Sequence, residues 1–180
     1  MKKDINLNLS TLTLVTIFVI IYYSIIHNSK AYYGNYNQNL RSFTIEGKAK
    51  IIDGDSIIID NHEIRLIDID APEYSQKCID AQKQYYDCGK SAKNYLTEIT
   101  QNQKIICHIS GKDYYSRYLA TCYNSIYNIN AMLVKNGWAI SYSKNNKYYN
   151  DEQLAQKNKL GLWQGDFITP KQYRKLNPRP

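Results

Sequence analysis

The stretch FTIEGKAKIIDGDSIIIDNHEIRLIDID, residues 43–70, decides the fold that the sequence predicts. Three β-rich runs follow one another in it, FTIEGKAKIID, DSIIID and HEIRLIDID, and turn residues separate them at Asp53-Gly54 and Asn61-His62. Short turns between β-rich runs are typical of antiparallel strands. The stretch therefore predicts a three-stranded antiparallel meander.

The chain beyond this meander alternates helical and extended patterns. Apolar residues at i, i+3, i+4 and i+7 indicate a helix, and Asn and Gly residues supply cap and stop signals for others. The expected elements are helix 89–101, strands 104–109 and 118–123, a helix capped at Asn128 or Asn130 and stopped at Gly137, and a helix that opens with a capping box at 150–153 and ends at Gly161. Five strands with a helix between the third and fourth follow the chain order of an OB barrel. We predict a mainly β domain of the α+β class, an OB-fold five-stranded β-barrel with three helices.

Residues 1–31 have the three-part pattern of a secretory signal. Positive charge at Met1–Lys3 precedes an uncharged run at Leu12–Ile26, and small residues follow at Ser29 and Ala31. A spanning helix needs about 20 apolar residues, so the run is short for one, but it can be extended back through Leu9. A cleaved signal peptide and a retained membrane anchor both stay open, and either predicts an exported protein, secreted, periplasmic or anchored facing outward.

Composition divides the rest of the chain. Residues 32–42 are polar and aperiodic and are expected to be a linker, residues 43–164 form the predicted domain, and residues 165–180 are a basic, Pro-flanked tail. The 23 basic and 16 acidic residues give a net charge of +7. This balance favours anionic partners such as nucleic acid or a membrane surface. No protein partner can be inferred from it.

The four cysteines lie beyond the signal segment, at Cys78, Cys88, Cys107 and Cys122. An even number in an exported chain predicts disulfides. If the two strands after the helix form a hairpin that is symmetric about residues 114–115, Cys107 faces Cys122 at a Cα separation of about 4.5–5.5 Å, within disulfide range. The favoured pairing is therefore Cys107 with Cys122 and Cys78 with Cys88.

Carboxylates are concentrated in one segment of this basic chain. Seven of the 16 acidic residues lie between residues 53 and 73. They are Asp53, Asp55, Asp60, Glu63, Asp68, Asp70 and Glu73. Such a density indicates that a cation binds there. Carboxylates without nearby Cys, and with a single His in a turn, select Ca²⁺ or Mg²⁺ rather than zinc.

The segment RLIDIDAPEY, residues 65–74, has to bend for these groups to meet. In a straight strand Arg65 and Asp70 point to opposite faces, because side chains alternate. They converge if the strand bends or ends near residues 67–69. Pro72 restricts Ala71 to extended conformations, which fixes the direction of the Ala71 carbonyl, a possible metal ligand.

The motifs IDGDSIII, RLIDIDAPE and DYYSRYLA, in this order, resemble the thermonuclease family of staphylococcal-nuclease-like domains. The resemblance runs from about Lys48 to Trp163 and includes the G-W-A segment at Gly137 and the K-L-G-L-W segment at 159–163. It implies an OB-fold, Ca²⁺-dependent phosphodiesterase that acts on DNA and RNA and leaves 3′-phosphates.

The resemblance also implies roles for individual residues. Asp55 and Asp70 match carboxylates that bind one Ca²⁺, and Ala71 matches a position whose backbone carbonyl completes the protein ligands. Glu73 matches the residue proposed as the general base, or as the group that orients the attacking water.

Two arginines match those that bind the scissile phosphate, Arg65 and Arg117. Their planar, bidentate donors suit the charge that develops on phosphate oxygens. Ser116 stands where the family usually has glycine, so the geometry of that turn is in question. The alternative for each arginine is an ordinary ion pair, of Arg65 with Glu63 or Asp60, and of Arg117 with Asp113.

The sequence thus predicts an exported Ca²⁺-dependent nuclease of low sequence specificity, with DNA or RNA as substrate. Two other functions stay open. One is a non-catalytic OB-fold module that binds nucleic acid at the cell envelope, and the other is an envelope adhesion or structural protein whose acidic cluster holds Ca²⁺ for stability. The presence of the full set of matched carboxylates and arginines favours the nuclease.

Overall fold

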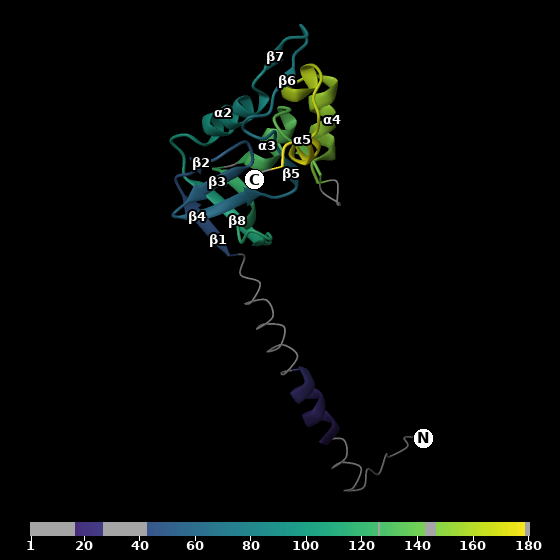
Figure 1. The fold of residues 1–180 in the computed structure, drawn as a ribbon. Coiled ribbons are helices and arrows are strands. Elements are labelled where there is room, and N and C mark those ends of the chain that lie inside the picture. Colours follow the sequence, from purple (N-terminus) through teal and green to yellow (C-terminus); the bar gives the residue numbers. More distant parts are fainter. Residues whose placement is uncertain (1–16, 27–42, 126, 143–146, 179–180) are drawn as a thin grey trace, which may run out of the picture. The chain divides into compact units, whose positions relative to one another are not determined.

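The structure, a computed structural model, describes residues 17–26, 43–125, 127–142 and 147–178. The chain divides into two compact units, Met1–Arg41 and Ser42–Pro180. In the first unit, residues 17–26 form a helix (Figure 1). No helix in the described part of the chain is long and apolar enough to cross a membrane. The charged start and the cleavage region of the predicted signal, and the predicted linker, lie outside the described residues.

The second unit is a mixed α+β domain built on one large sheet with the strand order β1-β8-β9-β4-β3-β2, and β10 pairs with β9 beside this path (Figure 1). Its strands are β1 (Thr44–Gly47), β2 (Lys50–Ile51), β3 (Ser56–Ile59), β4 (His62–Leu66), β8 (Ile105–Lys112), β9 (Tyr118–Asn124) and β10 (Tyr127–Asn128). The ladders of β2 with β3 and of β3 with β4 are antiparallel, so the predicted meander is confirmed. The ladder of β4 with β9 is parallel.

The first predicted strand is split into β1 and β2, which lie at opposite edges of the sheet. Only two residues separate Gly47 from Lys50, so the two edges can be no more than about 11 Å apart there. The sheet must therefore curl. Among the described residues no ladder joins β1 to β2, so the α+β class is confirmed but the closed five-stranded barrel is not.

In the described part of the domain, five helices and two small ladders accompany the large sheet. The helices are α2 (Cys88–Thr100), α3 (Ile129–Lys135), α4 (Tyr149–Lys157), the 3₁₀ helix η1 (Gly161–Gln164) and α5 (Pro170–Leu176). The small antiparallel ladders join β5 (Ile69–Asp70) to β11 (Ile140–Ser141) and β6 (Cys78–Ile79) to β7 (Tyr85–Tyr86). The first three of these helices match the three that the sequence predicts.

Helix capping agrees with the prediction from the sequence at α3 and differs from it at α4 and α5. Asn128 caps α3 by accepting the Ala131 N–H, as expected. The expected capping box at 150–153 is wrong, because α4 begins after Tyr148 without a side-chain cap. A capping box opens α5 instead, inside the segment predicted to be a tail: Thr169 and Gln172 bond reciprocally and Pro170 occupies the first turn.

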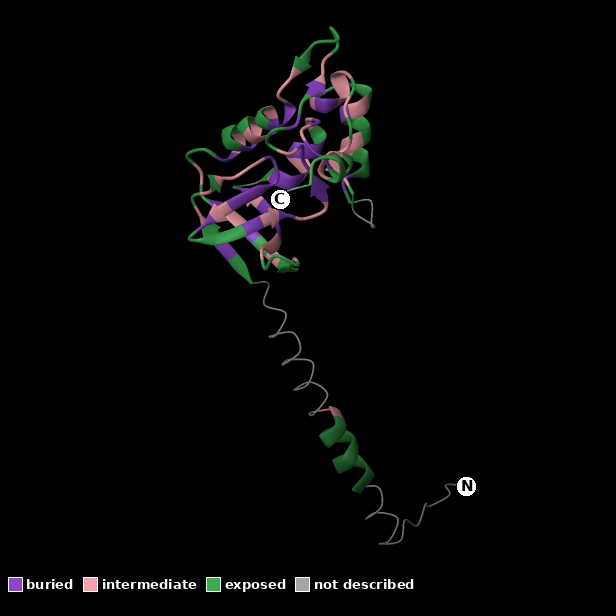
Figure 2. Cartoon of the chain, in the orientation of Figure 1, coloured by how far each residue is buried: buried purple, intermediate pink, exposed green. Residues whose placement is uncertain are grey.

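The core lies between the inner face of the sheet and the helices. Ile57, Ile59 and Ile64 alternate inward along β3 and β4 and are fully buried, as are Leu96 of α2 and Leu133 of α3 (Figure 2). Burying each of these side chains stabilises the fold by roughly 1.5–3 kcal/mol. The strand ends that carry the candidate site are therefore held by a packed interior.

Both predicted disulfides are present. Cys107 faces Cys122 directly in the β8–β9 ladder with a Cα separation of 4.0 Å. Cys78 joins β6 to Cys88 at the start of α2, with a Cα separation of 5.6 Å. The second disulfide closes the loop that follows RLIDIDAPEY, so it restrains the segment next to the candidate site.

The turn between β8 and β9 accommodates Ser116 with a left-handed backbone, φ 65°. The Asp113 carboxylate holds this turn by accepting the N–H groups of Tyr115, at 2.9 Å, and Arg117, at 3.0 Å. The turn forms without the glycine usual at this position, but a residue with a Cβ is strained there.

Replacing Ser116 with Gly should stabilise the domain by about 0.5–1 kcal/mol, because relief of the left-handed strain exceeds the entropy that glycine adds to the unfolded chain. Thermal unfolding should show a rise in Tm of about 2–4 °C. The matched control is Tyr114→Gly in the same turn, where φ is not positive and glycine should lower Tm. An equal effect of both substitutions would contradict the strain argument.

Candidate functional site

Strand register places Asp55 beside Arg65. Ser56, the first residue of β3, pairs with Arg65 in the ladder with β4, and the Leu66 N–H donates to the Asp55 carbonyl at 2.9 Å. The strand then ends, as the sequence requires, and Asp68 takes a left-handed backbone with φ 68°. This break returns Asp70, in β5, to the side on which Arg65 lies.

Arg65 joins the two aspartates with separate nitrogens. Its Nη1 lies 2.8 Å from Asp55 Oδ1 and its Nη2 lies 3.0 Å from Asp70 Oδ1. Both aspartates are buried, with 3% and 5% of their surface exposed. Asp55 also accepts the Ser56 hydroxyl on Oδ1, at 3.1 Å, and the Ala71 N–H on Oδ2, at 2.9 Å. The guanidinium of Arg65 therefore bridges two buried carboxylates.

Burial governs the electrostatics of this pair. Desolvation raises the pKa of Asp55 to about 7, against the opposing effect of Arg65. Burial alone would lower the pKa of Arg65, but the carboxylates of Asp55 and Asp70 outweigh it and the pKa is raised. With Glu73 and Arg174 included, three carboxylates face two guanidiniums, so negative charge is in excess and a further cation beside them would be stabilising.

The donor set fits a hard cation such as Ca²⁺. A carboxylate oxygen offers about two acceptor directions. Arg65 bonds to Oδ1 of both aspartates, whereas Oδ2 of each accepts one bond in the described part of the chain, from Ala71 N–H at Asp55 and from Arg174 at Asp70. An acceptor direction thus remains on each Oδ2. No group of three or more His, Cys, Asp and Glu side chains placed to hold a metal occurs among the described residues, so any protein site here needs a backbone oxygen, such as that of Ala71, or water.

The three residues matched to catalysis line one cavity. Its volume is about 750 Å³, and Arg65, Glu73 and Arg117 all lie in its wall. Arg117 donates from Nε to Asp113 Oδ2 at 2.8 Å, its Nη2 lies 2.8 Å from the same oxygen, and its Nη1 lies 4.0 Å from Glu63. The ion pair with Asp113, which was the alternative reading of Arg117, is therefore present, and it holds the guanidinium at the cavity wall.

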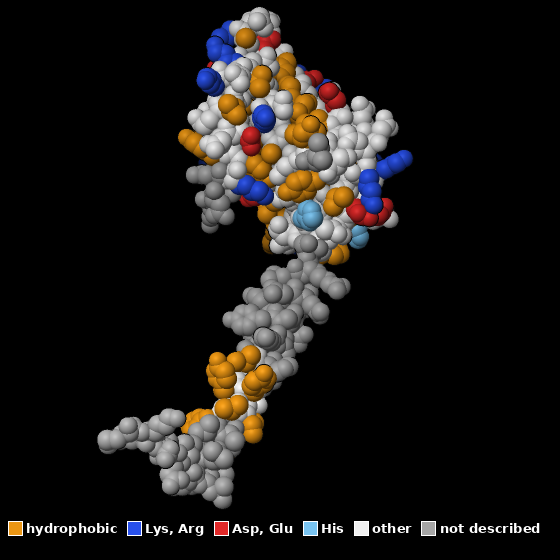
Figure 3. Space-filling view, turned by 180° about the vertical axis from the view of Figure 1, so that it is seen from behind, with side chains coloured by type: hydrophobic (Ala, Val, Ile, Leu, Met, Phe, Trp, Pro, Cys, Tyr) orange, Lys and Arg blue, Asp and Glu red, His pale blue; other side chains and the backbone are white. Residues whose placement is uncertain are grey.

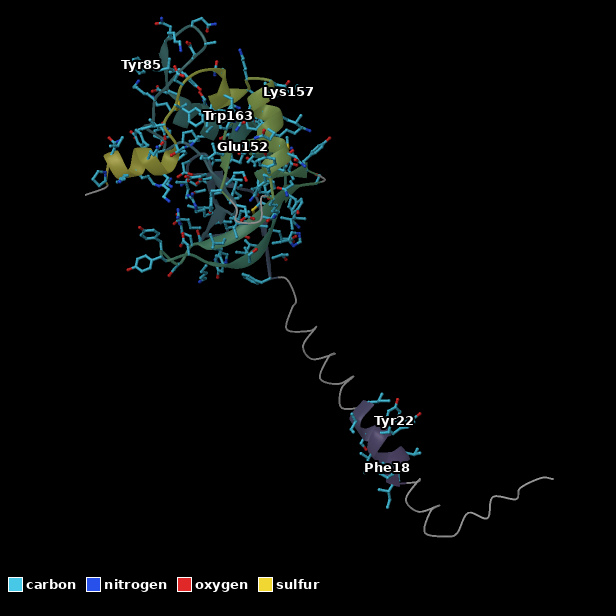
Figure 4. The ribbon with its side chains drawn as sticks, turned by 90° about the vertical axis from the view of Figure 1, so that its right-hand side faces the viewer. Phe18, Tyr22, Tyr85, Glu152, Lys157 and Trp163 are labelled. Carbon is cyan, nitrogen blue, oxygen red and sulfur yellow. A yellow bond between two sulfur atoms is a disulfide. The ribbon has the colours of Figure 1, made fainter. Side chains whose placement is uncertain are left out.

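Backbone contacts outside the cavity support Asp70. Asp70 pairs with Ile140 in the β5–β11 ladder. The next residue of β11, Ser141, donates its N–H to Glu152 of α4 at 2.9 Å, and Figure 4 labels Glu152 within the domain. Helix α4 therefore helps to fix the strand that carries this carboxylate.

Arg174 of α5 enters the site and was not predicted to do so. It donates from Nη1 and Nη2 to the two oxygens of Asp70, at 3.0 Å each, and from Nη1 to Glu73 Oε1 at 3.0 Å. The hydrogen bonds with Asp70 are the main reason that the pKa of Arg174 is raised. The pattern Thr169-Pro170 with Gln172 is a helix-start signal that the sequence does contain, but it predicts a helix and not this contact.

Other residues considered from the sequence lie elsewhere. The Asp68 carboxylate lies 3.8 Å from Lys147, whereas Asp53 accepts the Asp55 N–H at 3.1 Å and lines the cavity. Tyr115 lines the same cavity, and Tyr142 lines a second hollow of about 520 Å³ next to Arg65. On the face drawn in Figure 3, Lys and Arg side chains are scattered among hydrophobic ones, so the basic charge is not gathered there.

Comparison with known proteins finds one matching family model and several proteins of similar sequence. The family model described as "Staphylococcal nuclease homologue" matches residues 63–165, more than half of the chain. A succinoglycan biosynthesis protein, ExoI, from Rhizobium meliloti is 33% identical over 66% of this chain and 64% of its own length. An uncharacterized endonuclease from Haemophilus influenzae is 33% identical over 70% of each chain. A micrococcal nuclease from Shigella flexneri is 31% identical over 63% of this chain and 70% of its own length.

Proposed function

This chain belongs to the family of staphylococcal nuclease homologues, and we propose that it is a Ca²⁺-dependent nuclease. It hydrolyses phosphodiester bonds of DNA, RNA or both with low sequence specificity and leaves 3′-phosphates. The observation that supports this best is the shared cavity: Arg65, Arg117 and Glu73 line one hollow beside the buried pair of Asp55 and Asp70.

The proposed mechanism gives each of these side chains a role. Arg65 and Arg117 bind the scissile phosphate, because a guanidinium presents two parallel donors to phosphate oxygens. Glu73 takes a proton from the attacking water while the new oxygen–phosphorus bond forms, and the 5′ oxygen leaves with the electron pair of the broken bond and takes a proton from solvent water. Asp55, Asp70 and the Ala71 carbonyl would hold Ca²⁺. When bound, this cation would offset the charge of the scissile phosphate and orient that phosphate.

Single-stranded or frayed nucleic acid is the proposed form of the substrate. The cavity lies between the β8–β9 turn, which carries Arg117, and α5, which carries Arg174. Walls on both sides leave access for one strand more readily than for a duplex. Tyr115 is 76% exposed beside Arg117, so it can stack on an unpaired base.

We further propose that the protein acts outside the cytoplasm. Two disulfides in one domain support an oxidising environment. The positive start, the uncharged run and the small residues of positions 1–31 support export by a signal segment. Comparing the mass of the exported protein with that of the full chain would distinguish a cleaved signal from a retained anchor.

The test is cleavage of denatured DNA and of RNA by residues 32–180, with Ca²⁺ or with a chelator. Asp55→Ala serves as the control against contaminating nuclease. We expect cleavage that requires both Ca²⁺ and Asp55. A folded protein that binds Ca²⁺ but cleaves neither substrate would overturn the proposed function in favour of a binding module.

A further inference from the structure

The C-terminal segment is hydrogen-bonded to the loop that carries Glu73 and to the residues that follow it. Ile79 exchanges backbone hydrogen bonds with Asp166, at 2.9 and 3.0 Å. The fully buried Gln76 donates from its side chain to the Ile168 carbonyl at 2.8 Å, and the hydroxyls of Ser75 and Tyr173 are 3.1 Å apart. Residues 75–79 are therefore connected to residues 166–173, the segment that leads into α5 and its first turn, at three successive points.

Gln76 also fixes the Glu73 loop on its own side. The Glu73 N–H donates to the Gln76 side chain at 3.3 Å, and the Gln76 N–H donates to the Glu73 carbonyl at 2.7 Å. The Gln76 carbonyl accepts the Gly89 N–H at the start of α2, at 3.2 Å. One buried residue, Gln76, thus joins the loop, α2 and the segment that leads into α5 through its side chain and its backbone.

These hydrogen bonds hold α5 where Arg174 contacts two carboxylates, those of Asp70 and Glu73. Its two nitrogens face the two oxygens of Asp70 as a fork, and one of them also contacts Glu73 Oε1. Its side chain is 38% exposed, whereas that of Asp70 is 6% exposed. The planar fork fixes the plane of the Asp70 carboxylate, and the third bond fixes Glu73 relative to that plane.

We propose that Arg174 is a positioning residue that holds Glu73 in register with Asp70 from the C-terminal helix. The inference rests on the proposed function, since it assigns to α5 the alignment of the base with the cation-binding carboxylate. Figure 4 shows α5, in yellow, apart from α4, where Lys157 is labelled. The helix that serves the site is thus the last one of the chain, which the sequence indicates only as a basic tail.

A competing arrangement is a latch, in which Arg174 occupies the place of the cation and must leave before it binds. The hydrogen bonds favour positioning. Asp70 Oδ2 and Asp55 Oδ2 each keep an acceptor direction with Arg174 in place. Ser75 contacts α5 at Tyr173, and Gln76 contacts Ile168 just before the helix, so a withdrawal of α5 that removed Arg174 would also break these bonds.

The test compares Arg174→Gln, Arg174→Lys and the matched control Lys175→Gln, which removes the same charge from an exposed position of α5. For each variant, Tm, Ca²⁺ affinity by titration calorimetry, and kcat and KM at saturating Ca²⁺ are measured. We expect Arg174→Gln to lower kcat about 10- to 100-fold with KM within about threefold of wild type. Arg174→Lys should remain at least about tenfold slow, because an ammonium cannot form the fork.

Ca²⁺ affinity gives an independent readout. Arg174→Gln should bind Ca²⁺ about threefold or more tightly than Lys175→Gln, because it removes positive charge from Asp70 while Arg65 still orients that carboxylate. A merely structural residue would lower affinity, kcat and Tm together, and a latch would leave kcat unchanged or raised. Any of these results would overturn the proposal.

Failure of the proposed function is distinguishable from failure of this inference. If the wild-type protein cleaves nothing, the proposed nuclease fails while the Ca²⁺ titration still tests Arg174. Equal Ca²⁺ affinities of Arg174→Gln and Lys175→Gln would then show that Arg174 does not contact Asp70 in solution and would overturn the inference.

Discussion

Glu73→Gln should lower the turnover of nucleic acid by about 10²- to 10⁴-fold at saturating Ca²⁺, the range that general-base catalysis contributes. The amide keeps the size of the side chain and can still accept a hydrogen bond from Arg174, which lies 3.0 Å from Oε1. It cannot take a proton from water. Substrate affinity should change little, because the proposed mechanism assigns phosphate binding to Arg65 and Arg117.

The measurement is single-turnover cleavage of a labelled single-stranded oligonucleotide, with affinity determined separately in a chelator. The matched control is Glu63→Gln, since Glu63 lines the same cavity and its side chain is 48% exposed. The control should retain most of the wild-type rate. Equal rates for wild type and Glu73→Gln would remove Glu73 from the mechanism and leave the arginines and the cation as the source of catalysis.

The central fold could be predicted from the sequence because its strands carry their own pattern. Inward alternation along β3 and β4 and the turn residues between them determine the meander. The splitting of the first strand could not be predicted, because residues 43–53 form one continuous β-rich run. What separates β1 from β2 is the pairing of Thr44–Gly47 with β8 and of Lys50–Ile51 with β3, a choice made by strands distant in the chain.

Part of the candidate site could likewise be predicted from the sequence, and part of it could not. Asp55 directly precedes β3, Arg65 lies in β4 and Asp70 lies in β5, so local turns and register bring them together. Arg174 lies 104 residues beyond Asp70, and its contact depends on the buried Gln76 and the packing of α5. Basic residues near the end of a chain usually face water, so composition favoured a tail over a site component.

Arg65→Lys should lower kcat/KM by about 10²- to 10³-fold, because one ammonium cannot replace a guanidinium that bridges two carboxylates and, in the proposed mechanism, also binds phosphate. The structure shows why the loss has two parts. Nη1 and Nη2 contact different aspartates, at 2.8 and 3.0 Å, so Lys can satisfy one of them and leaves the other partly unpaired. With a buried ion pair disrupted, the free energy of unfolding should fall by about 1–3 kcal/mol.

Denaturant unfolding and cleavage rates measured on the same samples separate these two effects. The matched control is Arg117→Lys, since Arg117 also lines the cavity but pairs with a single aspartate in a surface turn. It should lose activity with a stability loss below about 1 kcal/mol. If Arg65→Lys were destabilised but cleaved at the wild-type rate, Arg65 would be an organiser of the carboxylates alone, and phosphate binding would fall to Arg117. Loss of both stability and rate in Arg65→Lys, with loss of rate alone in Arg117→Lys, would assign to Arg65 both the assembly of the carboxylate pair and the binding of phosphate.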